Sequence, residues 1–327
     1  MDNYGEVTVS IDIMKVNKIP FLVSISDHIH YGTSTAMPDM TEETMFSVLK
    51  ELDQFYMRRG FKINVVLADK QFQCLDNSLA ERQMMLNIAA QDEHVPQVER
   101  YIRVLKERMR CAIHNTPFTK IPPRMVIGLM AYVLFYINGL PWEGGVSMIL
   151  SPMTIVTGRK LDYKLHCKVP FGAYAHVRRG TDNTMKHRTF GAIAMGPMSN
   201  MQGGMTFMSL LTGRKIERDK PDYTILPMPD EVVDQVNRMG HGNPDGLLFT
   251  DAEDNDLDIE EEMEETMPDN EEEEQSRSDE ESMNEQDNNN DVVNDEVPED
   301  NNSDMDDGIE NTGVAVSYTH LTLPTKA

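Results

Sequence analysis

Three acidic residues occur where strand and helix patterns are expected to direct them to a common point. Asp12 lies in an alternating strand pattern, Asp69 ends a buried strand pattern, and Glu99 lies on an amphipathic helix pattern. Converging carboxylates repel one another and raise one another's pKa unless cations lie between them. Mg²⁺ suits such a group, because it binds through a few carboxylates together with phosphate oxygens. The pattern therefore predicts in-line displacement at a phosphodiester by two metal ions about 3.5–4 Å apart.

Each acid also has a simpler explanation. A strand-end aspartate is more often a turn or cap residue, and a glutamate on a helix face is usually solvated. Glu99 is accompanied along its helix by a basic stripe that could follow a phosphate backbone without reading its sequence. The same stripe could be an ordinary solvated face on which Arg103 pairs with Glu99. The stripe consists of Arg100, Arg103, Lys106 and Arg110.

Hydrophobic periodicity predicts the elements that must position the three acids. Residues 7–14 alternate apolar and polar side chains, which predicts a strand with Asp12 on the face opposite its apolar residues. Residues 62–69 are an uninterrupted β-branched run, typical of a buried strand. Residues 95–114 predict an amphipathic helix, and residues 125–137 predict an interior helix because they are apolar on nearly every side.

The remaining patterns predict an α/β fold followed by a small β domain. Asp39 and Glu42 have the spacing of a capping box, which predicts a helix that begins at Asp39 and ends before Gly60. Short β-like runs between residues 161 and 228 predict a small barrel or meander. Further strands are expected at 20–25 and 28–34, and a short helix at 231–239.

The charge of the chain is concentrated in one tract. The chain has 327 residues, 30 bases, 55 acids and a net charge of −25. The first 250 residues hold 28 bases and 26 acids, whereas residues 251–311 hold 29 acids and one base. This tract cannot bury enough apolar surface to offset chain entropy, so disorder is expected from Asp251 onward. The final residues, "VSYTHLTLPTKA", resemble a translated sequencing adapter and are excluded from the fold prediction.

Two classes of protein are excluded by composition. The three cysteines are far apart and form no C-x-x-C pair, which excludes a disulfide framework and a cysteine-rich zinc module. The longest apolar run, residues 125–137, has 13 residues, whereas a helix needs roughly 20 to cross a bilayer. No membrane association is therefore expected.

Several segments resemble integrases of copia-type LTR retrotransposons, with the closest likeness to algal copia-like elements. "QVERYIRVLKERMR" resembles the "V-E-R-x-x-R-x-L-x-E-x-x-R" segment around the catalytic glutamate of that family. "LADKQF" lies where the family has "T-D-N-G-x-E-F", and "IDIMKVNKIPF" would supply the first aspartate. "SPMTIVTGRK" and "FGAYAHV" are similar to "P-x-E-L-x-T-G-x-K" and "F-G-x-x-A-Y-V-H-V". The resemblance extends over residues 7–239.

The resemblance implies a ribonuclease H-like core, which is a mixed five-stranded sheet flanked by helices, followed by a small β-barrel. Its domains would be the catalytic core at 1–143, a connector and barrel at 144–240, and a disordered acidic linker at 241–313. Residues 314–327 would be a non-native tail. The chain would be a fragment that begins inside the integrase and ends in the linker.

The resemblance also implies an activity. Integrases of this family trim the ends of element DNA with water, then use the freed 3′ hydroxyl to attack target DNA. Asp12, Asp69 and Glu99 would be the catalytic metal ligands for two Mg²⁺ or Mn²⁺ ions. The implied partners are element ends, target DNA and further copies of the chain. Action in the nucleus, after a stage in cytoplasmic particles, would follow.

Two alternatives to an active enzyme stay open. The "D-K-Q-F" segment lacks the Asn-Gly of the family motif, "QDEHVPQ" replaces its "P-Q-Q-N-G" loop, and the His-His-Cys-Cys zinc module is not found. A catalytically inactive nucleic-acid-binding remnant fits these differences. The acidic tract could instead bind basic partners, repel DNA as an autoinhibitory tail, or act only as a solvated linker.

Overall fold

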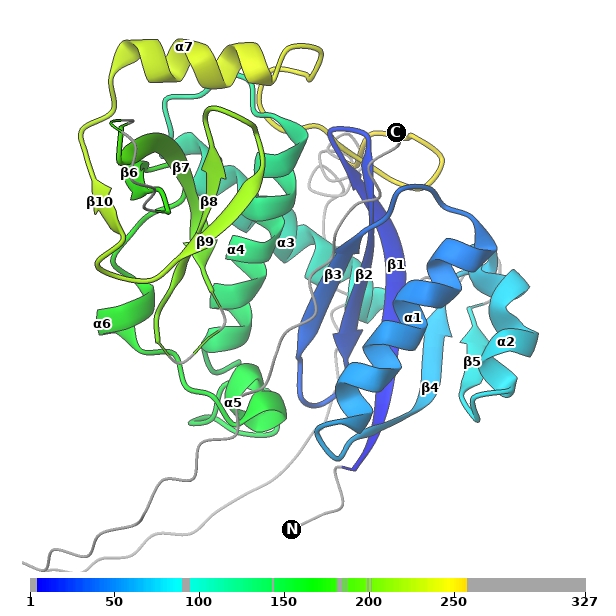
Figure 1. Ribbon diagram of the computed structural model, residues 1–327. Helices are drawn as coiled ribbons and strands as arrows, with labels where there is room; N and C mark the ends of the chain where they lie inside the picture. Colours follow the sequence, from blue (N-terminus) through cyan, green and yellow to red (C-terminus); the bar gives the residue numbers. More distant parts are fainter. Residues whose placement is uncertain are drawn as a thin grey trace, which may run out of the picture. The chain divides into compact units, whose positions relative to one another are not determined.

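The computed structural model describes residues 5–89, 95–142, 144–180, 185, 187–198, 200 and 202–257. Figure 1 shows the helices and strands along the chain. The elements are β1 (Glu6–Val16), β2 (Ile19–Ser26), β3 (Gly32–Ala36), α1 (Glu42–Met57), β4 (Lys62–Ala68), the 3-10 helix η1 (Lys70–Leu75), α2 (Asp76–Ala80), β5 (Met85–Ile88), α3 (Pro96–His114), α4 (Pro123–Gly139), α5 (Pro152–Thr157), α6 (Tyr163–His166), β6 (Tyr174–Arg178), β7 (Thr189–Pro197), β8 (Met205–Ser209), β9 (Lys215–Arg218), β10 (Tyr223–Ile225), α7 (Asp230–Met239) and β11 (Phe249–Thr250).

The first sheet is mixed and follows the order β3-β2-β1-β4-β5. β2 runs antiparallel to both β1 and β3, whereas β4 runs parallel to β1 and β5 runs parallel to β4. The predicted mixed five-stranded sheet is therefore confirmed. A further strand, β11, pairs antiparallel with the end of β1 and was not predicted from the sequence.

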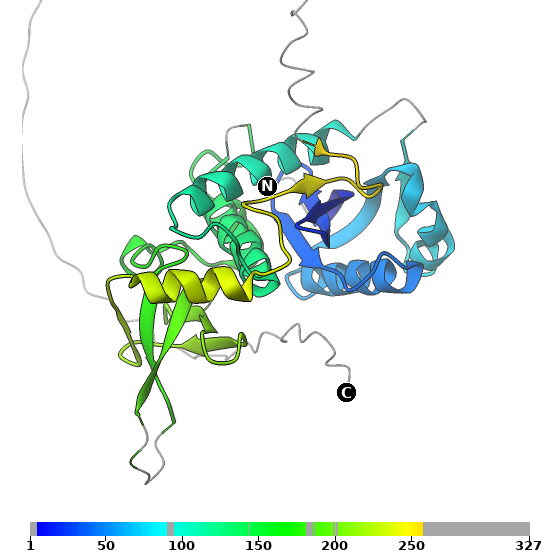
Figure 2. The ribbon, with the colours of Figure 1, turned by 90° about the horizontal axis from the view of Figure 1, so that it is seen from above.

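Alternation along β1 separates two hydrophobic cores. Ile11 and Ile13 belong to the core beneath α1, whereas Met14 and Val16 belong to the core beneath α3 and α4. Successive side chains of a strand point to opposite faces. Asp12 therefore faces the side of the sheet that α3 covers. Figure 2 shows the sheet lying between α1 and α3.

The helices largely follow the sequence predictions. α3 and α4 confirm the helices expected at 95–114 and 125–137, and each begins with a proline whose fixed φ suits a first helical turn. α1 begins three residues later than predicted. Thr41 is its N-cap, and the Asp39 carboxylate accepts hydrogen bonds from the Thr41 and Thr44 hydroxyls, each at 2.6 Å. Asp39 thus supports the capping residue instead of acting as the cap.

The second sheet is antiparallel and has the order β10-β6-β7-β8-β9. Ile193 and Met195 of β7 pack into the same core as α4. The β structure expected as a small barrel or meander is present as this sheet, and among the described residues no pairing joins β9 to β10. The two edge strands are short, with four and three residues. None of the helices in the described ranges is both long and apolar enough to span a membrane.

A buried amide joins α4 to the edge strand β3. The Asn138 side chain accepts a hydrogen bond from the Gly32 N–H at 2.9 Å and donates one to the Gly32 carbonyl at 2.7 Å. Asn138→Ala leaves both backbone groups without this partner and is expected to lower the free energy of unfolding by about 2–3 kcal/mol. Urea denaturation measures this loss, with the exposed Asn77→Ala as control. An equal effect of the two substitutions would contradict the role given to Asn138.

Candidate active site

Asp12 lies in a stretch of β1 between its pairing with β4 and its pairing with β11. The pairing of β1 with β4 runs only to Ser10 opposite Leu67, and the pairing with β11 begins at Lys15. The Asp12 carboxylate is partly buried. Its Oδ1 accepts hydrogen bonds from the Ile13 N–H at 2.6 Å and from Gln71 Nε2 at 3.2 Å. These two donors fix the orientation of the carboxylate.

Asp69 directly follows β4, the parallel neighbour of β1. It occupies the N-cap position of η1, but its side chain makes no capping hydrogen bond there. The simpler explanation of Asp69 as a cap is therefore not supported for this helix. Because β4 ends beside this stretch of β1, Asp69 belongs to the same edge of the sheet as Asp12.

Glu99 lies in the first turn of α3, which begins above β1. Gln97, two residues before Glu99, accepts a hydrogen bond at 3.2 Å from Ser10, which is two residues before Asp12. Gln97 also donates to Asp27 after β2, at 3.4 Å. The start of α3 is thus held against the face of the sheet that carries Asp12.

The pKa of Asp12 depends on its burial and on the charges of the two other predicted acids. Burial is the largest influence and raises the pKa of Asp12, while the Ile13 N–H opposes it. The negative charges of Asp69 and Glu99 raise this pKa further, and Glu253 adds a fourth negative charge. The pKa of Asp12 reaches about 7, from an ordinary value of 3.8. Asp69 and Glu99 therefore each lie within electrostatic reach of Asp12, and sequence reasoning missed Glu253.

The three acids do not form a ready-made chelating group. In the part of the chain that the structure describes, no three His, Cys, Asp or Glu side chains are grouped so that they could hold a metal ion. The donor chemistry fits Mg²⁺ or Mn²⁺ nonetheless, because all three side chains offer carboxylate oxygens.

Two solved integrase structures are similar to this chain. One is the catalytic core domain of BIV integrase, with 17% identity and a TM-score of 0.36, covering 46% of this chain and 93% of that one. The other is the simian T-cell lymphotropic virus intasome in complex with PP2A regulatory subunit B56 gamma. It has 13% identity and a TM-score of 0.32, covering 68% of this chain and 82% of that one. No family model and no curated protein matches the sequence.

The basic stripe of α3 divides into two parts. Arg100 and Arg103, next to Glu99, are exposed. Lys106 is only 2% exposed, and its ammonium donates to the Leu257 carbonyl at 3.1 Å. The Arg110 guanidinium lies 5.1 Å from the centre of the Phe249 ring. The prediction of one open stripe of four bases is therefore wrong for Lys106, because residues near 249–257 cover that end of the helix.

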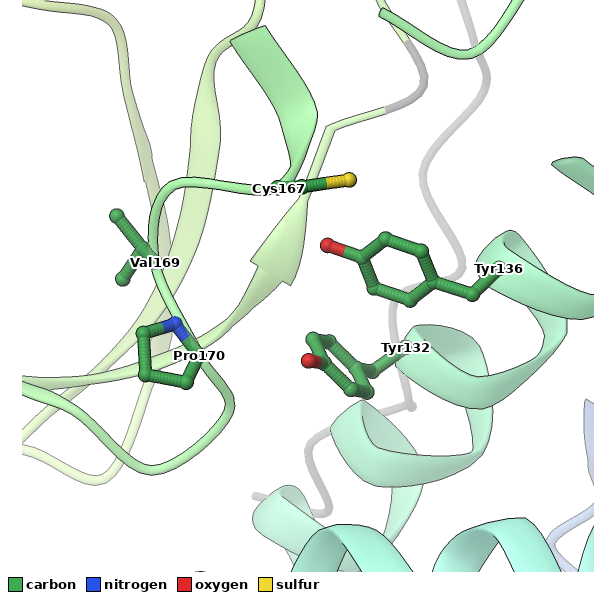
Figure 3. Close-up of a pocket in the computed structure, with 5 residues that line it drawn as sticks. All are labelled: Tyr132, Tyr136, Cys167, Val169 and Pro170. Carbon is green, nitrogen blue, oxygen red and sulfur yellow. The ribbon is translucent and has the colours of Figure 1, made fainter. Parts of the chain in front are cut away.

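A hollow of about 230 Å³ elsewhere is lined by Tyr132, Tyr136, Cys167, Val169 and Pro170. Figure 3 shows the Cys167 thiol and the two tyrosines around it. Burial raises the pKa of Cys167, so the thiol stays protonated at neutral pH. With no carboxylate or base in its lining, this hollow does not offer the chemistry predicted from the sequence.

The charge cluster at Asp12 has a consequence for stability. The raised pKa means that the folded chain binds more protons than the unfolded chain between about pH 4 and 7. The stability from this protonation is complete below pH 3.8 and is lost as the pH rises to about 7. Asp12→Asn keeps an acceptor for Ile13 and Gln71. In metal-free buffer it is expected to stabilise the fold by about 1–2 kcal/mol at pH 8, after discounting for solvent screening, and by little at pH 4.

Urea denaturation at the two pH values measures this difference. Asp76→Asn, an exposed acid on the neighbouring helix α2, is the matched control and should be neutral at both. A destabilised Asp12→Asn variant at pH 8 would show that Asp12 is not held among like charges.

Proposed function

We propose that this chain is an integrase of a copia-type LTR retrotransposon, of the algal copia-like branch. It would trim the 3′ ends of element DNA and transfer them into target DNA. The observation that carries this proposal is the electrostatic coupling of Asp12 to Asp69 and Glu99, three acids that are far apart in sequence. The motif resemblance around Glu99 and Asp69 supports the same activity.

Asp12, Asp69 and Glu99 would hold two Mg²⁺ or Mn²⁺ ions. When bound, the ions supply charge neutralisation for an in-line displacement at phosphorus, first by water and then by a 3′ hydroxyl. The Ile13 N–H and the Gln71 amide keep the Asp12 carboxylate in one orientation. Gln97 holds the start of α3, and with it Glu99, against β1. The chain thereby preorganises its own oxygen donors.

Arg100 and Arg103 are the exposed bases nearest Glu99, and they would contact the phosphates on either side of the reacting one. Such contacts position a duplex without reading its sequence. Lys106 and Arg110 would join them only after the covering residues have moved. Element ends and target DNA would be the substrates.

We also propose an oligomeric state and a cellular location. The chain would act as a homo-oligomer, in the nucleus, after a stage in cytoplasmic particles. The acidic linker, with its 29 acids in residues 251–311, would repel DNA or meet basic partners. The assigned linker and non-native tail fall mostly outside the described residues, which end at 257.

A strand-transfer assay tests the activity. The full chain is incubated with a labelled duplex that carries a recessed 3′ hydroxyl and with supercoiled plasmid, in Mg²⁺ or Mn²⁺. We expect labelled plasmid, and we expect chelation of the metal with EDTA to abolish it. If the chain binds the duplex but joins nothing under any metal, the alternative of an inactive nucleic-acid-binding remnant replaces the enzyme.

A further inference from the structure

The chain that follows α7 returns to the first sheet. The Asn17 N–H donates to the Leu248 carbonyl at 2.9 Å, and the Leu248 N–H donates to Asn17 Oδ1 at 2.8 Å. β11 then pairs with the end of β1, and the Phe249 side chain is fully buried in the core beneath α3. Figure 2 shows this segment, in yellow, crossing to β1 and α3. Residues 246–250 therefore form a firm anchor.

Residues 251–257, here called the acidic strap, follow the anchor directly. Four of the seven residues are acids: Asp251, Glu253, Asp254 and Asp256. The strap has a defined shape, because the Asp251 carboxylate accepts hydrogen bonds from the Glu253 N–H at 2.9 Å and the Asn255 N–H at 2.8 Å. The strap is thus an ordered beginning of a tract whose composition predicts disorder.

The strap is held by two lysines. Lys15 Nζ donates to the Ala252 carbonyl at 2.7 Å and to Asp254 Oδ1 at 2.8 Å. Lys106 Nζ donates to the Leu257 carbonyl at 3.1 Å. Lys106 belongs to the basic stripe of α3. The strap therefore binds a lysine that the sequence analysis predicted to contact DNA. Glu253 meanwhile adds its charge to the group around Asp12.

The strap differs from its anchor in how strongly it is held. Phe249 is fully buried, whereas the side chains of Glu253 and Asp254 are exposed. The charge pair between Lys15 and Asp254 has its acid 72% exposed, and exposed pairs are weak and screened by salt. The strap can therefore lift while residues 246–250 stay in place.

We propose that the acidic strap is a built-in competitor of DNA, which must leave α3 and the edge of β1 before a duplex binds there. The strap engages Lys106 of the basic stripe through the Leu257 carbonyl, and it carries four acids whose charge opposes that of DNA phosphates. This inference rests on the proposed function, since it requires that DNA binds along α3.

The test uses the full chain with the four strap acids changed to their amides, Asp251→Asn, Glu253→Gln, Asp254→Asn and Asp256→Asn. These changes keep the hydrogen-bond acceptors of the strap. The control removes four charges from the distal tract, by changing Glu271, Glu272, Glu273 and Glu274 to Gln. Affinity for a labelled duplex is measured by fluorescence anisotropy without metal. We expect the strap variant to bind about tenfold more tightly than the unmodified chain, and the control to differ by less than about twofold.

A second measurement follows the movement of the strap. A Glu-specific protease cuts after Glu253 faster when the strap is lifted, because cleavage requires local unfolding. We expect saturating duplex to accelerate this cut in the unmodified chain and equally in the control variant, which keeps Glu253. Equal affinities of the strap variant and the control, or a cut that duplex does not accelerate, would overturn the inference and leave the proposed function standing. A chain that binds no duplex in any variant would overturn both.

Discussion

An Asp69→Asn variant is expected to lose at least about 1000-fold in the rate of strand transfer, with duplex binding nearly unchanged. The size follows from the several kcal/mol that a correctly held metal ion contributes to a phosphoryl-transfer transition state, at 1.36 kcal/mol for each factor of ten. The substitution is nearly isosteric. The fold should therefore tolerate it.

Single-turnover joining of a labelled duplex to plasmid measures the loss. Asp76→Asn, which removes a charge from exposed surface seven residues later, should retain the activity of the unmodified chain. Glu99→Gln should match Asp69→Asn, because both acids are proposed to hold the metal ions. An Asp69→Asn variant that joins DNA at the original rate would exclude a role for Asp69 in the chemistry.

The double variant Arg100→Gln/Arg103→Gln should weaken duplex binding by about tenfold near 0.1 M salt. It should also lower the slope of log K against log salt by about 2, since each phosphate contact contributes about one unit. Both arginines are exposed beside Glu99. Lys50→Gln/Arg58→Gln removes the same charge from α1, on the opposite side of the first sheet, and should leave the slope unchanged.

The Lys106→Met variant tests whether the covered part of the basic stripe contributes to duplex binding as the exposed arginines do. The Lys106 ammonium holds the strap through the Leu257 carbonyl, so its removal also releases the strap and should not weaken duplex binding as the arginine changes do. Anisotropy titrations across a salt series compare the three variants. Equal losses from Lys106→Met and from the arginine pair would mean that all four bases meet DNA as one open stripe.

The parts of the fold that local sequence determines could be predicted. Alternation in residues 7–14 correctly gave β1 and the orientation of Asp12, because period-two burial follows from the geometry of one strand. The stripe of α3 likewise follows from helical spacing, as the burial of Ile102, Leu105 and Met109 confirms. The β-branched run at residues 62–69 likewise predicts β4, which ends at Ala68, directly before Asp69. These patterns require no knowledge of distant residues.

The parts that depend on distant contacts could not be predicted. Lys15 bonds to Ala252 across 237 residues of sequence, and β11 has only two residues, too few to show any period. The strap has the same acidic composition as the tract that follows it, so composition assigned both to disorder. Spacing places Lys106 on the same stripe as Arg103, and nothing local tells which lysine a returning segment will cover.

The most direct test of the account is anomalous diffraction from crystals of the full chain grown with Mn²⁺. If the three acids hold the metal ions, we expect an anomalous peak within about 2.0–2.2 Å of carboxylate oxygens from both Asp12 and Asp69. We also expect Glu99 to lie beside the same peak or beside a second one about 4 Å away. Manganese bound only elsewhere, with Asp12, Asp69 and Glu99 sharing no ion, would contradict the account.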